Sequence, residues 1–221
     1  MEKGRTKVLE DLADAVERGK LPEMTELLAK GLSGGIRAES LLNDGLIRGM
    51  MRLGVKFKNH EVFVPDVLVA SRALKKGSEI LRPALSGEGV APIGVAVVAT
   101  VKGDLHDIGK TLVGIMFEGV GIRVVDLGVD VDAETLGKAI ICHKPDIVAL
   151  SALLNTTLNQ LAEAISALDR AGLRRRVRIM VGGSPVTEEF AARIGADGYA
   201  DDAVTAAQTA RNILEQARRE R

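Results

Sequence analysis

The sequence predicts an α/β protein: a Rossmann-like (flavodoxin-like) five-stranded parallel sheet, preceded by a four-helix bundle. From about residue 93 onward, short apolar runs alternate with segments of helical periodicity, as buried parallel strands and their covering helices do. Before about residue 88 the periodicity is helical throughout, which is typical of a small bundle. Segment 86–92 contains glycine and proline and is expected to be a linker, so that residues 1–85 and 93–221 form two domains.

The first domain is expected to contain four helices. The first ends near Gly19, and the second begins at Pro22 and continues to about Lys30. A third helix has one apolar face between residues 42 and 57, and a fourth extends from about 65 to 81.

The second domain shows the alternation of a parallel sheet. Strands are expected at 93–99, 122–126, 146–150, 177–181 and near 198–199. Helices are expected at 108–119, 132–142, 158–171, 187–194 and 202–218.

Composition narrows the classes of function. Thirty basic and 30 acidic residues give a net charge of zero, so no nucleic-acid partner is expected. The one cysteine, Cys142, cannot form a disulfide within the chain, which favours the cytoplasm. No apolar run approaches the ~20 residues of a membrane span, so no membrane partner is expected either.

The loop after the first predicted strand carries the most informative motif, G-D-L-H-D-I-G-K at 103–110. It places His106 at the carboxyl end of a buried strand, where open α/β sheets bind ligands. A carboxylate two residues earlier, Asp104, can hydrogen-bond the ring nitrogen that faces away from a metal. Alternatively, Asp104 or Asp107 caps the helix that begins near Ile108, and His106 is an exposed loop residue.

Two further loops at carboxyl strand ends have unusual composition. Residues 151–157 read S-A-L-L-N-T-T, and residues 182–185 read G-G-S-P. Paired glycines allow a large group to approach the backbone closely. Taken singly, the hydroxyl residues could cap helix 158–171 and the glycines could form an ordinary turn. Three such loops at one sheet edge favour a binding site.

These motifs resemble those of the corrinoid (cobalamin-binding) proteins of methyltransferase systems, over about residues 37–205. The matching pieces are V-K-G-D-L-H-D-I-G-K at 101–110, V-D-L-G-V-D-V at 125–131, S-A-L at 151–153, G-G at 182–183, G-A-D-G-Y-A-D-D-A at 195–203, G-M-M-R-L-G-V-K-F at 49–57 and E-V-F-V-P-D-V-L-V-A at 61–70. The chain is similar to the cobalamin-binding module of cobalamin-dependent methionine synthase and to methylamine and methanol corrinoid proteins.

The resemblance implies a cobalamin or related corrinoid as cofactor. His106 would be the lower axial ligand of its cobalt, Asp104 would bind the other ring nitrogen, and the Thr157 hydroxyl would continue that relay. A cleft would take the displaced nucleotide tail of the corrinoid. The residues implied in cofactor binding besides those three are Gly103, Leu105, Asp107, Gly109, Ser151, Leu153, Asn155, Gly182, Gly183 and Ala203.

The resemblance also implies that the helical domain is a cap over the upper corrin face. Phe57 and Val64 fall at the capping positions, although periodicity alone favours plain core packing for Phe57. A permanent cap would block methyl transfer, so linker 86–92 is the candidate hinge.

The implied function is that of a methyl carrier without turnover of its own. It would accept a methyl group on cobalt(I) from a donor-specific methyltransferase. A second methyltransferase, acting on tetrahydrofolate or a thiol, would receive the methyl group from methyl-cobalt(III). A reductive activating protein would be a further partner of this chain. The alternative is a cobalamin-binding sensor module or the small subunit of a cobalamin-dependent mutase. The donor stays open among methylamines, methanol, betaines and aryl methyl ethers.

Overall fold

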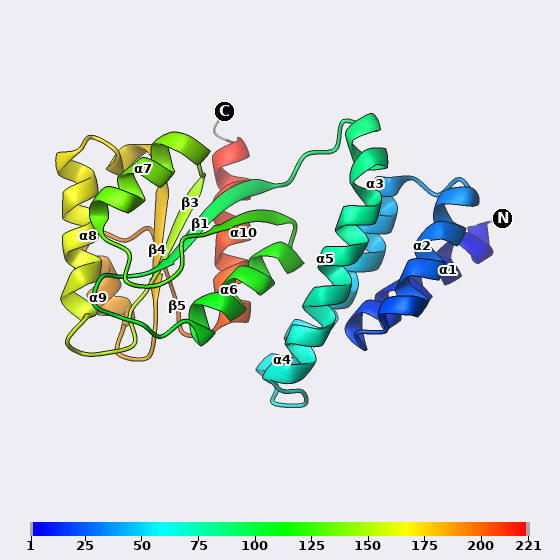
Figure 1. Cartoon of the computed structure of the whole chain (residues 1–221), viewed down its shortest axis with the longest axis horizontal. Coiled ribbons are helices and arrows are strands. Elements are labelled where there is room, and N and C mark those ends of the chain that lie inside the picture. The colour runs from blue at the N-terminus through cyan, green and yellow to red at the C-terminus, as the bar shows by residue number, and fades with distance from the viewer. Residues whose placement is uncertain (1, 220–221) are drawn as a thin grey trace. The chain divides into compact units, whose positions relative to one another are not determined.

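The computed structural model describes residues 2–219, which form two compact units (Figure 1). The first unit extends to Ala91 and also includes Gly119–Gly121, and the second contains Pro92–Glu118 and the chain from Ile122 onward. The expected fold class is confirmed: a helical unit precedes a unit built on one five-stranded parallel sheet. No helix of the described range is both long and apolar enough to cross a membrane.

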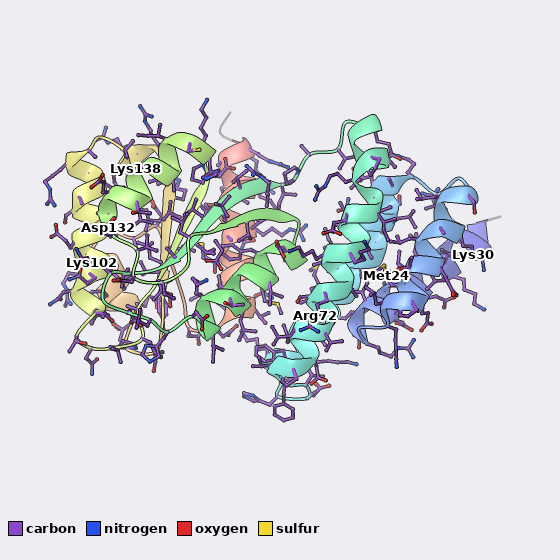
Figure 2. All side chains as sticks on the ribbon, in the orientation of Figure 1. Met24, Lys30, Arg72, Lys102, Asp132 and Lys138 are labelled. Atoms are coloured by element: carbon purple, nitrogen blue, oxygen red, sulfur yellow. The ribbon has the colours of Figure 1, made fainter. Side chains whose placement is uncertain are left out.

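The helical unit contains four helical segments, of which the third is composite. Its elements are α1 (Glu2–Glu17), α2 (Leu21–Ser33), α3 (Ala38–Ser40), η1 (Leu41–Ile47), α4 (Arg48–Lys58) and α5 (Val64–Gly87). Apolar side chains from all four segments are fully buried, among them Leu12, Met24, Leu46 and Leu81. In Figure 2, Met24 belongs to this core, whereas Lys30 and Arg72 lie on exposed helix faces.

Two features of this unit differ from the sequence prediction. The third helix is interrupted by η1, a π-helical stretch whose Gly45 lies against Leu12 of α1. The fourth helix continues past Pro83 to Gly87, although proline removes a backbone donor and often ends a helix. Its end is closed by a hydrogen bond from the Val90 amide to the Leu85 carbonyl, with Gly89 in the left-handed conformation.

The expected linker is therefore partly ordered structure of the first unit. Beyond α5, the Glu88 carboxylate accepts hydrogen bonds from the Ala38 and Glu39 amides, at 2.8 and 3.0 Å. These bonds attach the segment to the start of α3. Only the residues after Glu88 lack bonds of this kind, so the connecting stretch is shorter than the expected linker 86–92.

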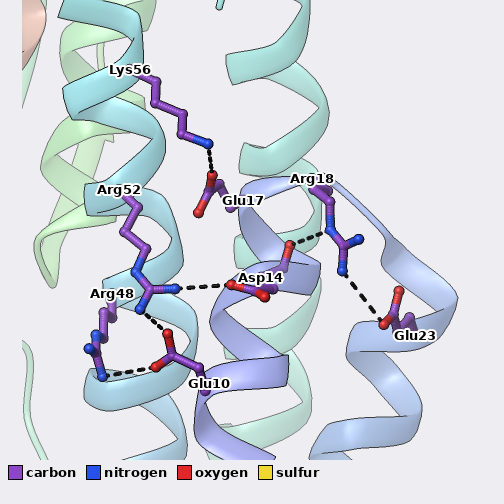
Figure 3. Close-up of polar contacts among 8 residues, drawn as sticks. All are labelled: Glu10, Asp14, Glu17, Arg18, Glu23, Arg48, Arg52 and Lys56. Atoms are coloured by element: carbon purple, nitrogen blue, oxygen red, sulfur yellow. Dashed lines mark hydrogen bonds and ion pairs between the residues drawn. The ribbon is translucent and has the colours of Figure 1, made fainter.

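A ladder of ion pairs joins α1 to α4 (Figure 3). Arg52 pairs with both Glu10 and Asp14, and the Arg52–Asp14 distance is 3.0 Å. Arg48 also reaches Glu10, at 3.3 Å, and Lys56 reaches Glu17, at 2.5 Å. The cationic residues recur every four positions and so lie on one face of α4. The pairing raises the pKa of Arg52, mainly through its hydrogen bond to Glu10.

We predict that Arg52→Met destabilises the protein by about 1 kcal/mol at low salt, because it removes two of these pairs at once. Added salt should shrink the difference, since the pairs are partly exposed. Urea unfolding at low and high ionic strength measures both effects, and Arg72→Met on an exposed face of α5 is the control. A salt-independent loss would indicate that the packing of the side-chain stem, not its charge, is responsible.

The second unit is built on one parallel sheet with strand order β2-β1-β3-β4-β5. The strands are β1 (Gly94–Thr100), β2 (Ile122–Asp126), β3 (Ile147–Ser151), β4 (Arg178–Gly182) and β5 (Gly198–Ala200). The connecting elements are α6 (Ile108–Gly119), α7 (Ala133–His143), α8 (Leu158–Arg170), the 3-10 turn η2 (Arg174–Arg176), α9 (Glu188–Arg193) and α10 (Ala203–Arg219).

Helices cover both faces of this sheet (Figure 1). The α7, α8 and α9 helices pack on one face, where Val97, Leu150 and Ile179 point into a shared apolar core. The other face is covered by α6, whose Gly114 lies against Val124, and by α10, whose Leu214 lies against Gly94. Both faces of the strands are thus apolar, which explains their continuous apolar runs.

The strand order has one switch point, between β1 and β3, from which successive connections run in opposite directions along the sheet. The loops at the carboxyl ends of these two strands flank the crevice in which such sheets bind ligands. These loops contain His106 and Thr157, respectively.

Candidate functional site: a histidine loop at the switch point

Asp104 is the centre of the candidate site. Its side chain is fully buried, at 0% exposure, and its two oxygens receive four hydrogen bonds. Oδ1 accepts from the backbone amide and from Nδ1 of His106, at 3.0 and 2.8 Å. Oδ2 accepts from the Leu153 amide and the Thr157 hydroxyl, both at 2.7 Å. A carboxylate offers about four acceptor positions, so the hydrogen-bonding capacity of the Asp104 carboxylate is filled.

These bonds decide the charge of Asp104. Burial alone would raise its pKa, but the hydrogen bonds from Thr157, Leu153 and His106 outweigh burial and hold the pKa well below its usual range. Asp104 is therefore an ionised acceptor near neutral pH. It is not a helix cap, since its partners lie in its own loop and after β3.

The charge of Asp104 determines which nitrogen of the His106 ring carries the proton. Because an ionised carboxylate cannot donate, Nδ1 carries the proton of the Nδ1–Asp104 bond. In the neutral ring, Nε2 then has the free lone pair and is the nitrogen able to ligate a metal. The His106 side chain is 49% exposed, so the ring is oriented from one side while remaining accessible.

The surroundings of the ring are apolar and exposed. Leu105 and Ile108 flank His106 with 72% and 68% exposure, and Leu153 and Leu154 of the neighbouring loop are 42% and 40% exposed. Large apolar side chains gathered at a loop edge mark an interaction surface. Together they fit a flat, largely apolar ring system bound over the histidine.

The contacts of Thr157 decide whether its hydroxyl caps the helix that follows or belongs to the candidate site. It stands at the N-cap position of α8, yet its side chain makes no capping bond to that helix. The buried hydroxyl contacts Asp104 Oδ2 instead, with the Leu154 carbonyl as a second acceptor at 3.0 Å. Thr157, Asp104 and His106 thus form one continuous hydrogen-bonded chain.

We predict that Thr157→Val destabilises the protein by about 1.5 to 3 kcal/mol at neutral pH, because a buried carboxylate loses a donor. The bond contributes stability above the ordinary carboxyl pKa of about 3.9, and this contribution disappears as pH falls toward the lower folded-state value. Urea unfolding followed from pH 7 down to pH 2 should show the difference persisting at pH 4 and shrinking at the acid end, because Asp104 stays ionised in the fold well below a pH of about 3.9. Thr157→Ser keeps the hydroxyl and should lose much less; an equal loss would contradict the account.

The predicted glycines serve different purposes. Gly103 has φ +79°, a left-handed conformation that side chains rarely adopt. Gly183 has φ +123°, and a Cβ there would lie 1.9 Å from the Ala152 carbonyl oxygen. A Cβ on Gly182 would lie 2.9 Å from the Ala200 carbonyl oxygen. Close backbone packing within the sheet unit therefore requires glycine at 182 and 183 whether or not a ligand does. Gly109 faces open space.

The other predicted positions are spread around this centre. Ser151 is half-buried at the end of β3, where its carbonyl accepts from the Val101 amide and so ties the two loops together. Asp107 and Asn155 are exposed, and Ala203 is buried in the first turn of α10.

Phe57 and Val64 belong to the helical unit. Phe57 lies in the last turn of α4 and Val64 begins α5, and both are half-buried there. Their neighbour Phe63 is 67% exposed.

Metal-ligand chemistry restricts the kind of group that His106 can bind. Across residues 2–219, no cluster of three or more histidine, cysteine or acidic side chains is able to hold a metal ion. A single protein ligand is sufficient only where the other ligands arrive with the metal, as in a metal macrocycle.

Comparisons with known proteins identify the group that this family binds. Two family models match, each described as a B12 binding domain: one over residues 94–208 and the other over residues 8–82. This chain belongs to the B12-binding corrinoid proteins of methyltransferase systems. Its cofactor is cobalamin or a related corrinoid, and the single oriented histidine and its apolar surroundings fit that group.

Relatives match over nearly the whole chain. A corrinoid protein of Desulfitobacterium hafniense is 36% identical over 210 residues, covering 94% of this chain and 97% of its own length. Dimethylamine corrinoid protein 3 of Methanosarcina acetivorans is 36% identical over 207 residues, again covering 94% and 97%.

Solved structures agree with the fold. The methanol:cobalamin methyltransferase complex MtaBC from Methanosarcina barkeri contains a chain with a TM-score of 0.84 and 28% identity, covering 95% of this corrinoid protein and 80% of that chain. A cobalamin-binding protein from Desulfitobacterium hafniense has a TM-score of 0.77 and 32% identity, covering 93% and 98%.

Proposed function

We propose that this corrinoid protein accepts a methyl group from a donor-specific methyltransferase and delivers it to a second methyltransferase acting on tetrahydrofolate or a thiol. The observation that carries the proposal is the His106 ring, held by a buried ionised carboxylate and open on its other side. Relatives named dimethylamine and trimethylamine corrinoid proteins support methylamines as the donor class. The structural similarity to a methanol:cobalamin methyltransferase complex supports methanol equally.

When bound, the corrinoid supplies a cobalt ion that accepts and releases the methyl group. The chain would hold and tune it. His106 Nε2 would bind the cobalt, Asp104 would keep the Nδ1 proton in place, and Thr157 would keep Asp104 ionised and oriented. Ser151 and Asn155 are proposed to line a cleft for the nucleotide tail, Gly109, Gly182 and Gly183 to give the tail room, and Ala203 to lie near its end. The remaining proposed cofactor contacts are Gly103, Leu105, Asp107 and Leu153.

The helical unit would protect the upper face of the corrinoid. We propose Phe57 and Val64 as its shielding residues, with the segment after Glu88 as the hinge that lets it move aside. Further proposed features are a reductive activating protein as partner and a cytoplasmic location, the latter supported by the single exposed Cys142.

The test is methyl transfer by the purified full chain. Loaded with hydroxocobalamin and reduced by titanium(III) citrate, it is incubated with methyltransferases from neighbouring reading frames and with methylamines, methanol, betaines or aryl methyl ethers. Formation of the methylated cofactor with one donor, followed by transfer to tetrahydrofolate or a thiol, supports the proposal. Selective binding of adenosylcobalamin without methylation by any donor would favour the sensor or mutase alternative.

A further inference from the structure

The V-D-L-G-V-D-V segment at 125–131 has no role in the function described so far. Within it, Asp130 has φ +56°, which makes it one of three non-glycine residues with positive φ in the described range. Aspartate tolerates the left-handed conformation better than most residues, but glycine would adopt it without strain. A strained residue at a loop near a candidate site raises the question of what its side chain does there.

Asp130 holds the start of the histidine loop. Its Oδ1 accepts a hydrogen bond from the Gly103 amide at 2.7 Å, and its own amide donates to the Asp104 carbonyl at 3.0 Å. The two bonds stabilise the left-handed turn at Gly103, a residue without a side chain that could stabilise this turn. The backbone of Asp104 is thus fixed from outside the loop.

The far end of the histidine loop is held by Thr100, the last residue of β1. Its buried hydroxyl donates to the His106 carbonyl at 2.9 Å. The Thr100 carbonyl in turn accepts from the Val131 amide at 3.0 Å, next to Asp130. The loop is therefore attached at both ends to structure that lies outside it.

The holding segment is itself anchored. The buried ammonium of Lys110, in the first turn of α6, contacts Asp126 Oδ1 at 2.6 Å, and the same oxygen accepts from the Gly128 amide at 2.8 Å. At the other end Asp132, labelled in Figure 2, caps α7 by accepting from the Thr135 amide at 2.9 Å. A fixed segment of this kind can impose a position on its neighbour.

We propose that Asp130 is a positioning residue for His106: it fixes the Gly103–Asp104 turn so that the ring is oriented before the corrinoid binds. This inference rests on the proposed role of His106 as axial ligand. Asp104 would keep its bonds to Thr157 and Leu153 without Asp130, so the loop would loosen without unfolding. A loosened loop spreads the ring over orientations of which few suit the metal.

Two variants of Asp130 separate positioning from folding. Asp130→Gly removes the carboxylate and also relieves the positive φ, so its urea midpoint should be no lower than that of wild type. Asp130→Asn keeps an acceptor oxygen and tolerates the same conformation. Thr100→Val tests the other attachment with little change in buried volume, and Thr100→Ser is its control.

The first readout needs no cofactor. In the full-length chain without corrinoid, hydrogen exchange at the Gly103 amide should be about tenfold faster in Asp130→Gly than in wild type, and near wild type in Asp130→Asn. The second readout is the cobalt(II) paramagnetic resonance spectrum after loading with hydroxocobalamin. The ratio of histidine-on to histidine-off cofactor should fall about tenfold in Asp130→Gly and in Thr100→Val, and recover in Asp130→Asn and Thr100→Ser.

Wild-type exchange and an unchanged ligand ratio in Asp130→Gly would overturn the inference. So would an equal loss in Asp130→Asn, since its amide oxygen keeps the bond to Gly103. Wild-type protein without any histidine-ligated cobalt would overturn the proposed function instead, while the exchange measurement would still test whether Asp130 fixes the loop.

Discussion

His106→Ala is expected to remove the axial nitrogen from the bound corrinoid while leaving the fold intact. The side chain is half exposed and lies on a loop, so its loss creates no cavity in the core. The cobalt(II) spectrum should change completely from histidine-on to histidine-off. Corrinoid affinity should fall by at least about tenfold, the loss typical of weakened metal-site contacts. Binding should survive, because the proposed tail contacts remain.

The matched control is His143→Ala. His143 is half-buried in the last turn of α7, at the opposite edge of the sheet from His106, and should not affect the cofactor. Absorption and paramagnetic resonance spectra of both variants, each loaded with hydroxocobalamin, make the comparison. An unchanged spectrum in His106→Ala would show that another group ligates the cobalt.

Gly183→Ala is expected to cause the largest loss of stability of any single substitution in the candidate site. The new methyl group would lie 1.9 Å from the Ala152 carbonyl oxygen, and that atom is backbone between β3 and the Thr157 loop. The residue would also have to adopt φ +123°, outside the conformations that alanine favours. Strain and displacement together should cost about 3 to 5 kcal/mol.

Gly109→Ala is the control for this prediction, because a Cβ there meets nothing within 4 Å. It lies within α6, where alanine is favoured over glycine by about 1 kcal/mol. Urea unfolding should show a loss for Gly183→Ala and no loss for Gly109→Ala. A fall in corrinoid affinity in Gly109→Ala, without loss of stability, would support the proposal that the cofactor needs the open space there. Tolerance of alanine at 183 would contradict the backbone packing described here.

The sheet unit could be predicted closely because its signals are local. Each strand is a short apolar run between polar turns, and each helix has its own periodicity, so only boundaries shifted by a residue or two. The helical unit was harder at two places. The π-helical stretch at Gly45 depends on packing against Leu12, and the extension of α5 past Pro83 depends on the bonds that follow it. The contact of Gly45 with Leu12, and the bonds from Ala38 and Glu39 to Glu88 just beyond α5, both join residues that are distant in the sequence.

The same distinction applies to the candidate site. Asp104 and His106 could be predicted from their spacing, whereas the role of Thr157 was implied only by the family resemblance, and the structure joins the three by hydrogen bonds. The supporting role of Asp130 could not be identified, because it requires knowing that its loop lies beside Gly103. The V-D-L-G-V-D-V motif could be recognised in the sequence, but the hydrogen bond from Gly103 to Asp130 is evident only in the folded structure.

One nitrogen of His106 is proposed to ligate the cobalt of a bound corrinoid. A direct measurement uses the full-length protein prepared with ¹⁵N-labelled histidine, loaded with hydroxocobalamin and reduced to cobalt(II). We expect the nitrogen splitting in the paramagnetic resonance spectrum to change from a triplet to a doublet on labelling, and to be lost in His106→Ala. A triplet that persists in the labelled protein would show that the cofactor's own base remains the ligand and that His106 does not bind the cobalt.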